Sequence, residues 1–178
     1  MVALIKPYPI LTHSFVNYFI KKDLSNKILL ELGCGKSTIF WADYFKKVYS
    51  YESDSNYLQK LKNEYEIPKN VQIFNVKDKS ILEELNFLSH IKNSDYMIID
   101  NFKDPISRLE YAHCLTVNKR EDSQIILDNG SWNIECYTFL QNNFFCRDFP
   151  GTNCEKQATV TSLFFERKTE KYFNYEIY

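Results

Sequence analysis

Short apolar runs alternate along the chain with longer segments in which apolar residues recur at helical spacing. The apolar runs predict strands at Ile28–Leu32, Val48–Glu52, Val71–Val76, Tyr96–Asp100 and Gln124–Asp128. The amphipathic segments predict helices at Ser37–Phe45, Asp54–Tyr65, Ser80–Leu88 and Asp104–Leu115. The strand runs show little internal alternation, which is typical of parallel strands covered by helices on both faces. The pattern therefore predicts a doubly wound α/β fold.

The pattern changes after the fifth predicted strand. A helix is predicted at Ser131–Leu140, and two aromatic-rich strands follow at Phe144–Phe149 and Thr159–Glu166. We expect Pro150-Gly151 to join these strands as an antiparallel hairpin at the sheet edge. The expected fold class is α/β, Rossmann-like and doubly wound, with a seven-stranded mixed sheet that ends in a C-terminal hairpin.

Two predicted helices carry specific start signals. Ser80 with Glu83 fits a capping box, and Asp104 stands before Pro105 as a cap before a first-turn proline. We therefore expect helices to begin at these positions. Residues 1–27, with an amphipathic run at His13–Lys22, are expected to form an N-terminal cap segment that packs on the rest of the chain.

The composition of the chain limits the kinds of binding partner that we expect. The 178 residues, 44% hydrophobic and 25% charged, suit one globular domain. The formal charge is −1 and there is no long run of either sign, so we expect no nucleic-acid partner. No apolar run is long enough to span a membrane, and the N-terminus lacks a secretory pattern, so a cytoplasmic location and no membrane partner are expected.

The cysteines do not suggest a metal site or a disulfide framework. They are odd in number, scattered and without CxxC spacing: Cys34, Cys114, Cys136, Cys146 and Cys154. Cys34 lies in a glycine loop, where a small side chain in a tight turn is favoured over a nucleophile because no base lies near it in sequence.

The stretch LLELGCGKST, Leu29 to Thr38, admits two interpretations. Its end resembles a phosphate-binding P-loop, with Lys36 for phosphate and Asp100 after an apolar strand for magnesium. The first glycine of that motif would have to stand at Leu30, inside a strand. A dinucleotide fingerprint also fails, because its third glycine would be Thr38. A nucleotide hydrolase remains an alternative.

The other interpretation is a strand ending in an acid, then Gly-x-Gly, then a helix. Glu52 closes the next predicted strand, nineteen residues after Gly33, where a carboxylate can accept hydrogen bonds from both hydroxyls of a ribose. Asp78 follows the third strand, where it can reach an adenine edge. In this order the motifs resemble class I S-adenosylmethionine-dependent methyltransferases over roughly residues 28 to 166, so residues 28–178 are expected to form such a domain.

That resemblance implies S-adenosylmethionine as cofactor and methyl transfer as activity. The cofactor-binding residues that it implies are Glu31, Gly33, Cys34, Gly35, Glu52, Ser53, Asp78 and Asp100. A non-catalytic module that only binds the methyl donor is a further alternative.

Polar residues also follow the fourth and fifth predicted strands. Asp100, Asp128 and Asn129 offer hard oxygen ligands at neighbouring strand ends, which suit Mg²⁺. The arrangement resembles metal-dependent O-methyltransferases of the catechol and caffeoyl-coenzyme A type. The resemblance implies Asp100, Asp128 and Asn129 as metal ligands, Lys103 as general base with Asp100 in the catalytic set, and an oxygen of a small molecule or glycan as acceptor. Trp132, Tyr137 and Phe102 are candidates for an aromatic wall around that acceptor.

Overall fold

Seven strands form one mixed sheet. The computed structural model describes residues 7–76, 81–101 and 105–166. The strands are β1 (Ile28–Leu32), β2 (Lys47–Glu52), β3 (Val71–Asn75), β4 (Tyr96–Ile99), β5 (Gln124–Leu127), β6 (Phe145–Thr152) and β7 (Ala158–Phe165), in the order β3-β2-β1-β4-β5-β7-β6. The first five are parallel, and β7 runs antiparallel to both of its neighbours. The predicted fold class is confirmed.

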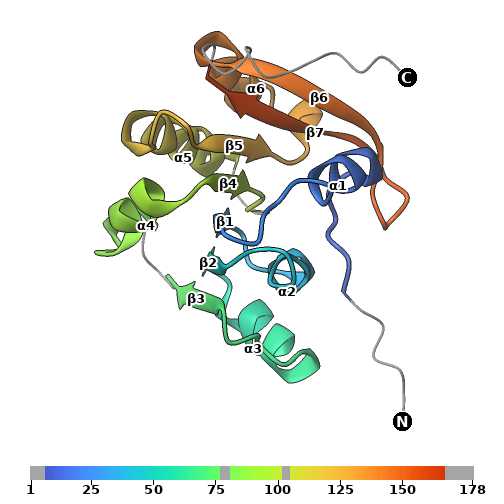
Figure 1. Ribbon diagram of the computed structural model, residues 1–178, viewed down its shortest axis with the longest axis vertical. Coiled ribbons are helices and arrows are strands. Elements are labelled where there is room, and N and C mark those ends of the chain that lie inside the picture. Colours follow the sequence, from blue (N-terminus) through green and yellow to red (C-terminus); the bar gives the residue numbers. More distant parts are fainter. Residues whose placement is uncertain (1–6, 77–80, 102–104, 167–178) are drawn as a thin grey trace.

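Helices cover both faces of this sheet (Figure 1). One face carries α1 (His13–Phe19), α2 (Lys36–Trp41) and α3 (Ser55–Glu64), and the other carries α4 (Phe87–Asn93), α5 (Pro105–Asn118) and α6 (Ile134–Asn143). Successive residues of β1 point to opposite layers: Leu29 packs with α1 and α2, and Leu30 with the α4 to α6 layer. Burial of both faces explains why the central strands show no alternation of apolar and polar residues.

The N-terminal segment belongs to this packing. Phe15 and Phe19 of α1 are fully buried against the sheet, and Phe19 packs edge-on against Trp41 of α2. The Thr12 hydroxyl donates to the Phe149 carbonyl oxygen at 2.9 Å, and the Ser14 hydroxyl donates to that of Pro150 at 2.9 Å. The start of the described chain is thus fastened to β6, at the far end of the sequence. Within the described residues, no helix is both long and apolar enough to cross a lipid bilayer.

The hairpin differs from the sequence prediction. Pro150 and Gly151 do not form the turn, because β6 continues through them and pairs them with Val160 and Thr159. Proline is tolerated there since β6 is an edge strand and needs no N–H on its free side. The turn is residues 153–157, held by Asn153, whose side-chain oxygen accepts from the backbone N–H of Glu155 and of Gln157, each at 3.0 Å.

The prediction of a helix at Ser80–Leu88 was wrong. The chain instead makes a 3₁₀ turn, η1 (Ile81–Glu83), and α4 begins only at Phe87. Phe87 and Ile91, one turn apart, are fully buried and fix α4 on the sheet, whereas Leu85 is 95% exposed. Burial of the later apolar pair therefore outweighs the local start signal, of which Ser80 lies outside the described residues.

Other boundaries shift by smaller amounts. The predicted helix Ser37–Phe45 ends at Trp41, and the prediction Ser131–Leu140 is divided into a 3₁₀ turn, η2 (Gly130–Trp132), and α6. The helix predicted at Asp54–Tyr65 is α3, and Asp54 caps it: its side chain accepts hydrogen bonds from the N–H groups of Asn56 and Tyr57. The predicted cap residue Asp104 lies outside the described residues.

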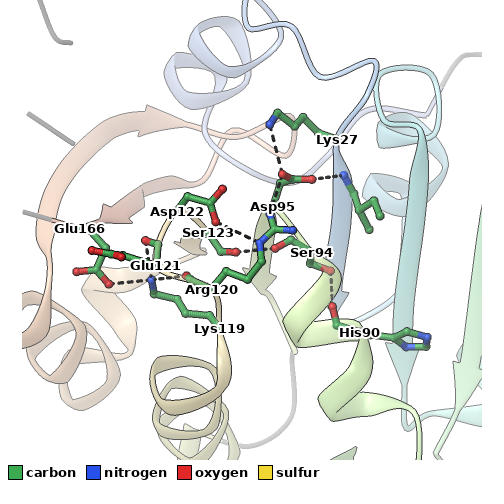
Figure 2. A network of polar contacts seen from close by, with 11 residues as sticks. Lys27, His90, Ser94, Asp95, Lys119, Arg120, Glu121, Asp122, Ser123 and Glu166 are labelled. Atoms are coloured by element: carbon green, nitrogen blue, oxygen red, sulfur yellow. Dashed lines mark hydrogen bonds and ion pairs between the residues drawn. The ribbon is translucent and has the colours of Figure 1, made fainter. Parts of the chain in front are cut away.

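A polar network joins the segments that enter β1, β4 and β5, at the amino-terminal ends of these parallel strands (Figure 2). Asp95, just before β4, accepts from the Ile28 N–H at 2.8 Å and from Arg120 at 2.9 Å, and it pairs with Lys27 at 3.3 Å. Lys119 pairs with Glu166 at 2.9 Å. These contacts hold the entries of β1, β4 and β5 together, so the site at the other end rests on a fixed sheet.

Candidate active site

The glycine loop after β1 rests directly on the end of β4. Gly33 has φ +100°, and a Cβ placed on it would lie 2.5 Å from the carbonyl oxygen of Asp100. The Gly33 N–H donates to the Tyr51 carbonyl oxygen at 2.9 Å, which ties the loop to β2 as well. Only glycine suits this conformation and contact. The loop is thus held over three neighbouring strand ends.

Glu52, the last residue of β2, faces this loop. Its carboxylate accepts hydrogen bonds from the N–H of Cys34 at 3.2 Å and of Asp54 at 2.7 Å. Burial raises the pKa of Glu52, while the N–H groups of Asp54, Cys34 and Ser53 oppose the rise. Ser53 itself is exposed. A carboxylate has about four acceptor positions, so Glu52 keeps capacity for further donors.

Glu31 lies fully buried below the loop. One carboxyl oxygen accepts from the hydroxyls of Thr38 and of Ser50, and the Thr38 hydroxyl oxygen accepts from the Gly35 N–H at 2.9 Å. The other oxygen, Oε1, is buried and has no hydrogen-bond partner among the described residues. Burial raises the pKa of Glu31 to about 7. The hydroxyls of Ser37, Thr38 and Ser50 oppose this rise in pKa, and Oε1 keeps acceptor capacity beneath the loop.

Cys34 has the properties of a packed thiol. It is buried with Leu58 and Leu61 of α3, and burial raises its pKa to about 12. Such a thiol stays protonated at neutral pH and is a poor nucleophile. All five cysteines are free in the structure.

Tyr57 of α3 lies across from the loop. A Cβ on Gly35 would lie 3.3 Å from the Tyr57 hydroxyl oxygen. The pKa of Tyr57 is raised to about 12, first by burial and then by the nearby acidic groups Cys34, Glu52, Glu31 and Asp100. Its hydroxyl therefore faces the same space as the residues predicted to bind the cofactor.

The structure brings the predicted polar residues of β4 and β5 together. The Asp128 carboxylate is fully buried and accepts from the Thr161 hydroxyl at 3.0 Å and from the Asn129 amide. The Asn129 amide oxygen accepts from the Thr159 hydroxyl at 2.6 Å. Asp100 shares a hydrogen bond with Asp128, and burial, then the Asp128 charge, raises the pKa of Asp100 well above its ordinary value. Burial also raises the pKa of Asp128, to about 6.

A buried arginine completes this cluster. Arg108 of α5 donates from Nε to the Asn101 carbonyl oxygen at 2.8 Å and from Nη1 to that of Asp128 at 2.7 Å. Its Nη2 lies 3.7 Å from Oδ1 of Asp100. One guanidinium therefore joins the two loops that follow β4 and β5.

Several predicted site residues cannot be placed. Asp78, Lys103 and Phe102 lie outside the described residues, and their roles stay predictions. Among the described residues, no group of three or more His, Cys, Asp and Glu is arranged to hold a metal. Trp132 is 57% exposed at the end of η2, whereas the Tyr137 hydroxyl donates to Asp148 on β6 at 2.8 Å. Leu30 is fully buried within β1, so the bend that a P-loop needs does not occur there.

The residues that sequence reasoning missed are mostly partners of predicted ones: Thr38, Ser50, Tyr57, Arg108 and Thr161. The sequence did contain a pattern that could have identified Arg108 as a buried residue. It falls on the buried stripe of α5 with Tyr111, Ala112 and Leu115, at positions i, i+3, i+4 and i+7. A charge on such a stripe needs a buried partner. The hydroxyl residues gave no comparable signal.

Comparisons of the sequence give no match to a protein-family model or to a curated protein. Comparison of the fold with solved structures does give matches. The O-methyltransferase TomG from Streptomyces achromogenes, solved with S-adenosylmethionine, has a TM-score of 0.60 at 12% identity, covering 79% of this chain and 73% of its own. Precorrin-6y C5,15-methyltransferase from Geobacter metallireducens gives 0.61 at 12%, covering 91% and 93%. An rRNA methylase from Streptococcus thermophilus gives 0.57 at 13%, covering 86% and 95%.

Each of these similarities covers more than three quarters of the chain. The seven-stranded mixed sheet with its C-terminal antiparallel hairpin is the fold class expected from the sequence. The chain therefore has the fold of class I S-adenosylmethionine-dependent methyltransferases.

Proposed function

We propose that this protein is an S-adenosylmethionine-dependent methyltransferase that methylates an oxygen of a small molecule or glycan. The observation that carries the proposal is the contact between three strand ends: Gly33 against Asp100, and Cys34 N–H on Glu52. This places a loop whose two glycines lack side chains beside a carboxylate that can bind a ribose diol. A fold alone does not define an activity, so the site residues bear the argument.

The residues present suit the methyl donor. Glu52 can accept hydrogen bonds from ribose hydroxyls, and the buried Oε1 of Glu31 is an acceptor without a partner among the described residues, suited to a donor or cation. The Gly33 and Gly35 backbone allows close approach of a ligand. When bound, S-adenosylmethionine supplies a methyl group on a positively charged sulfur. Acidic residues around the loop suit that charge.

The acceptor chemistry is inferred from the cluster at β4 and β5. Asp100 sits at the loop and contacts Asp128, so a polar acceptor group approaching Gly33 would meet carboxyl oxygens. Lys103, predicted as general base, would take the proton of an acceptor hydroxyl before attack on the methyl group. The solved neighbours include O-methyl, precorrin and rRNA methylating enzymes by their titles, so oxygen of a small molecule is the finer part of the proposal.

Calorimetry separates this proposal from the nucleotide hydrolase. S-adenosylhomocysteine, the demethylated product of the donor, and ATP are titrated separately into the wild-type protein. We expect binding of S-adenosylhomocysteine with one site per chain and no binding of ATP. Tight binding of ATP alone would favour the hydrolase. Once an acceptor is found, unchanged turnover in Lys103→Ala would exclude the lysine as base.

A further inference from the structure

Two of the three residues predicted to bind Mg²⁺, Asp128 and Asn129, already accept hydrogen bonds on their side-chain oxygens. Of the two Asp128 carboxylate oxygens, Oδ1 accepts from Thr161 and Oδ2 from Asn129, and the Asn129 amide oxygen accepts from Thr159. All four of these residues are buried. An octahedral Mg²⁺ requires ligand oxygens at about 2.1 Å in free directions. Each of these buried oxygens keeps a second lone pair, so an ion would have to share every one of them with a hydrogen-bond donor, and the arrangement suits the ion poorly.

A positive charge is nevertheless present at this place. The Arg108 guanidinium is only 5% exposed and makes its contacts to both strand-end loops: the Asn101 and Asp128 carbonyl oxygens, and the Asp100 carboxylate at 3.7 Å. Arginine keeps its charge under all ordinary conditions and holds planar hydrogen-bond geometry. It thus supplies a fixed cation 3.7 Å from the Asp100 carboxylate, held in place by the backbone carbonyl oxygens of Asn101 and Asp128.

The two cations exclude one another. A metal bound to the Asp100 and Asp128 carboxylates would lie within a few ångströms of the guanidinium in a buried site, where like charges repel strongly. Conversely, Arg108 without its acidic neighbours would be a buried charge lacking a partner, which is costly. The acidic residues at this site can therefore accommodate the Arg108 guanidinium, but not the guanidinium and a divalent metal ion together.

We propose that Arg108 takes the place of the divalent metal in this site and acts as a positioning residue that locks the loops after β4 and β5 without Mg²⁺. The inference concerns the site of the proposed function and rests on it for its role in methyl transfer. Its physical content, a protein cation in place of a metal, can be tested without any turnover.

The probe is Mn²⁺, which replaces Mg²⁺ at oxygen sites and is followed by electron paramagnetic resonance. It is titrated into wild type, Arg108→Met, Asp128→Asn, the double variant Arg108→Met/Asp128→Asn, and Arg147→Met as a matched control. Arg147 is an exposed residue of β6 whose guanidinium lies over the rings of Tyr18 and Phe149. We expect no stoichiometric binding by wild type or Arg147→Met. Arg108→Met should bind one Mn²⁺ at least about tenfold more tightly than wild type, because its carboxylates lose their cation. The Asp128 change should abolish that gain.

Two results overturn the inference. One is stoichiometric Mn²⁺ binding by wild type that Asp128→Asn removes. The other is a folded Arg108→Met that binds Mn²⁺ no better than wild type. If Arg108→Met does not fold, the wild-type titration alone decides in the same way. S-adenosylhomocysteine calorimetry is run with and without a chelator: absence of any binding refutes the proposed function, while the Mn²⁺ titrations still judge the role of Arg108.

Discussion

Gly33 links the sheet to the site because it lacks a side chain. Its backbone has a positive φ, and its α-carbon lies against the Asp100 carbonyl group, so the glycine loop and the end of β4 share one position. The sequence indicated a need for glycine here but not its neighbour. Gly35 differs, since its φ of −170° is open to any residue and the nearest atom to a Cβ is a tyrosine hydroxyl at 3.3 Å.

Gly33→Ala should destabilise the protein strongly. A positive φ costs a non-glycine residue about 1 to 3 kcal/mol, and overlap with the Asp100 backbone adds about as much, so we expect a loss of about 2 to 6 kcal/mol. Denaturant unfolding measures it. Gly35→Ala is the matched control and should lose far less, because the Tyr57 side chain can move. Equal losses in the two variants would contradict the packing described for Gly33.

Glu31 makes stability depend on pH in a defined direction. Its pKa is raised from 4.5 to about 7 in the folded protein because it is buried. The folded state therefore holds a proton that the unfolded chain releases between these values. Stability is highest below pH 4.5 and falls as pH rises to about 7, above which this contribution is constant.

Glu31→Gln should remove that dependence. Between pH 4.5 and pH 7.5 the wild type should lose up to about 3 kcal/mol more stability than the variant, which follows from the size of the pKa shift. Denaturant unfolding of both proteins at a series of pH values isolates the residue, because the other titrating groups cancel in the comparison. Parallel curves would show that Glu31 ionises normally.

At the scale of elements, the apolar runs predicted the strands correctly. The local turn and capping signals, in contrast, misplaced the ends of some elements. Five parallel strands followed from apolar runs, because burial on both faces leaves a plain sequence pattern. The hairpin turn was misplaced because Pro150-Gly151 is a strong turn signal, whereas an edge strand tolerates both residues. The start of α4 was misplaced because burial of Phe87 and Ile91 outweighs a capping pattern.

The sequence did not reveal that Asn153 holds the turn between β6 and β7. Its side chain is 1% exposed and bonds to two backbone N–H groups and to Gln157 across the turn. Asn153→Ala leaves those groups without partners and should cost about 1 to 3 kcal/mol. Glu155→Ala, at an exposed position of the same turn, should change the unfolding free energy by much less. A neutral Asn153→Ala would mean that the strands alone set the turn.

At the scale of the whole molecule, the site is where parts distant in sequence meet. The loop after β1, the end of β2 and the loops after β4 and β5 converge, and β7 reaches the same place through Thr159 and Thr161. Sequence order predicted the first four, because carboxyl ends of parallel strands share one edge. It could not predict the threonines or Arg108 as partners, since those contacts depend on the register of the sheet and the rotation of a helix.

The central claim is that the glycine loop and Glu52 together bind the adenosyl group of a methyl donor. The most direct measurement is calorimetric affinity for S-adenosylhomocysteine in wild type, Glu52→Gln and Glu66→Gln, the last an exposed glutamate outside the site. Glu52→Gln should weaken binding at least about tenfold, because a charged acceptor of ribose hydroxyls becomes neutral, and Glu66→Gln should bind like wild type. Wild-type affinity in Glu52→Gln, or no binding by the wild type, would contradict it.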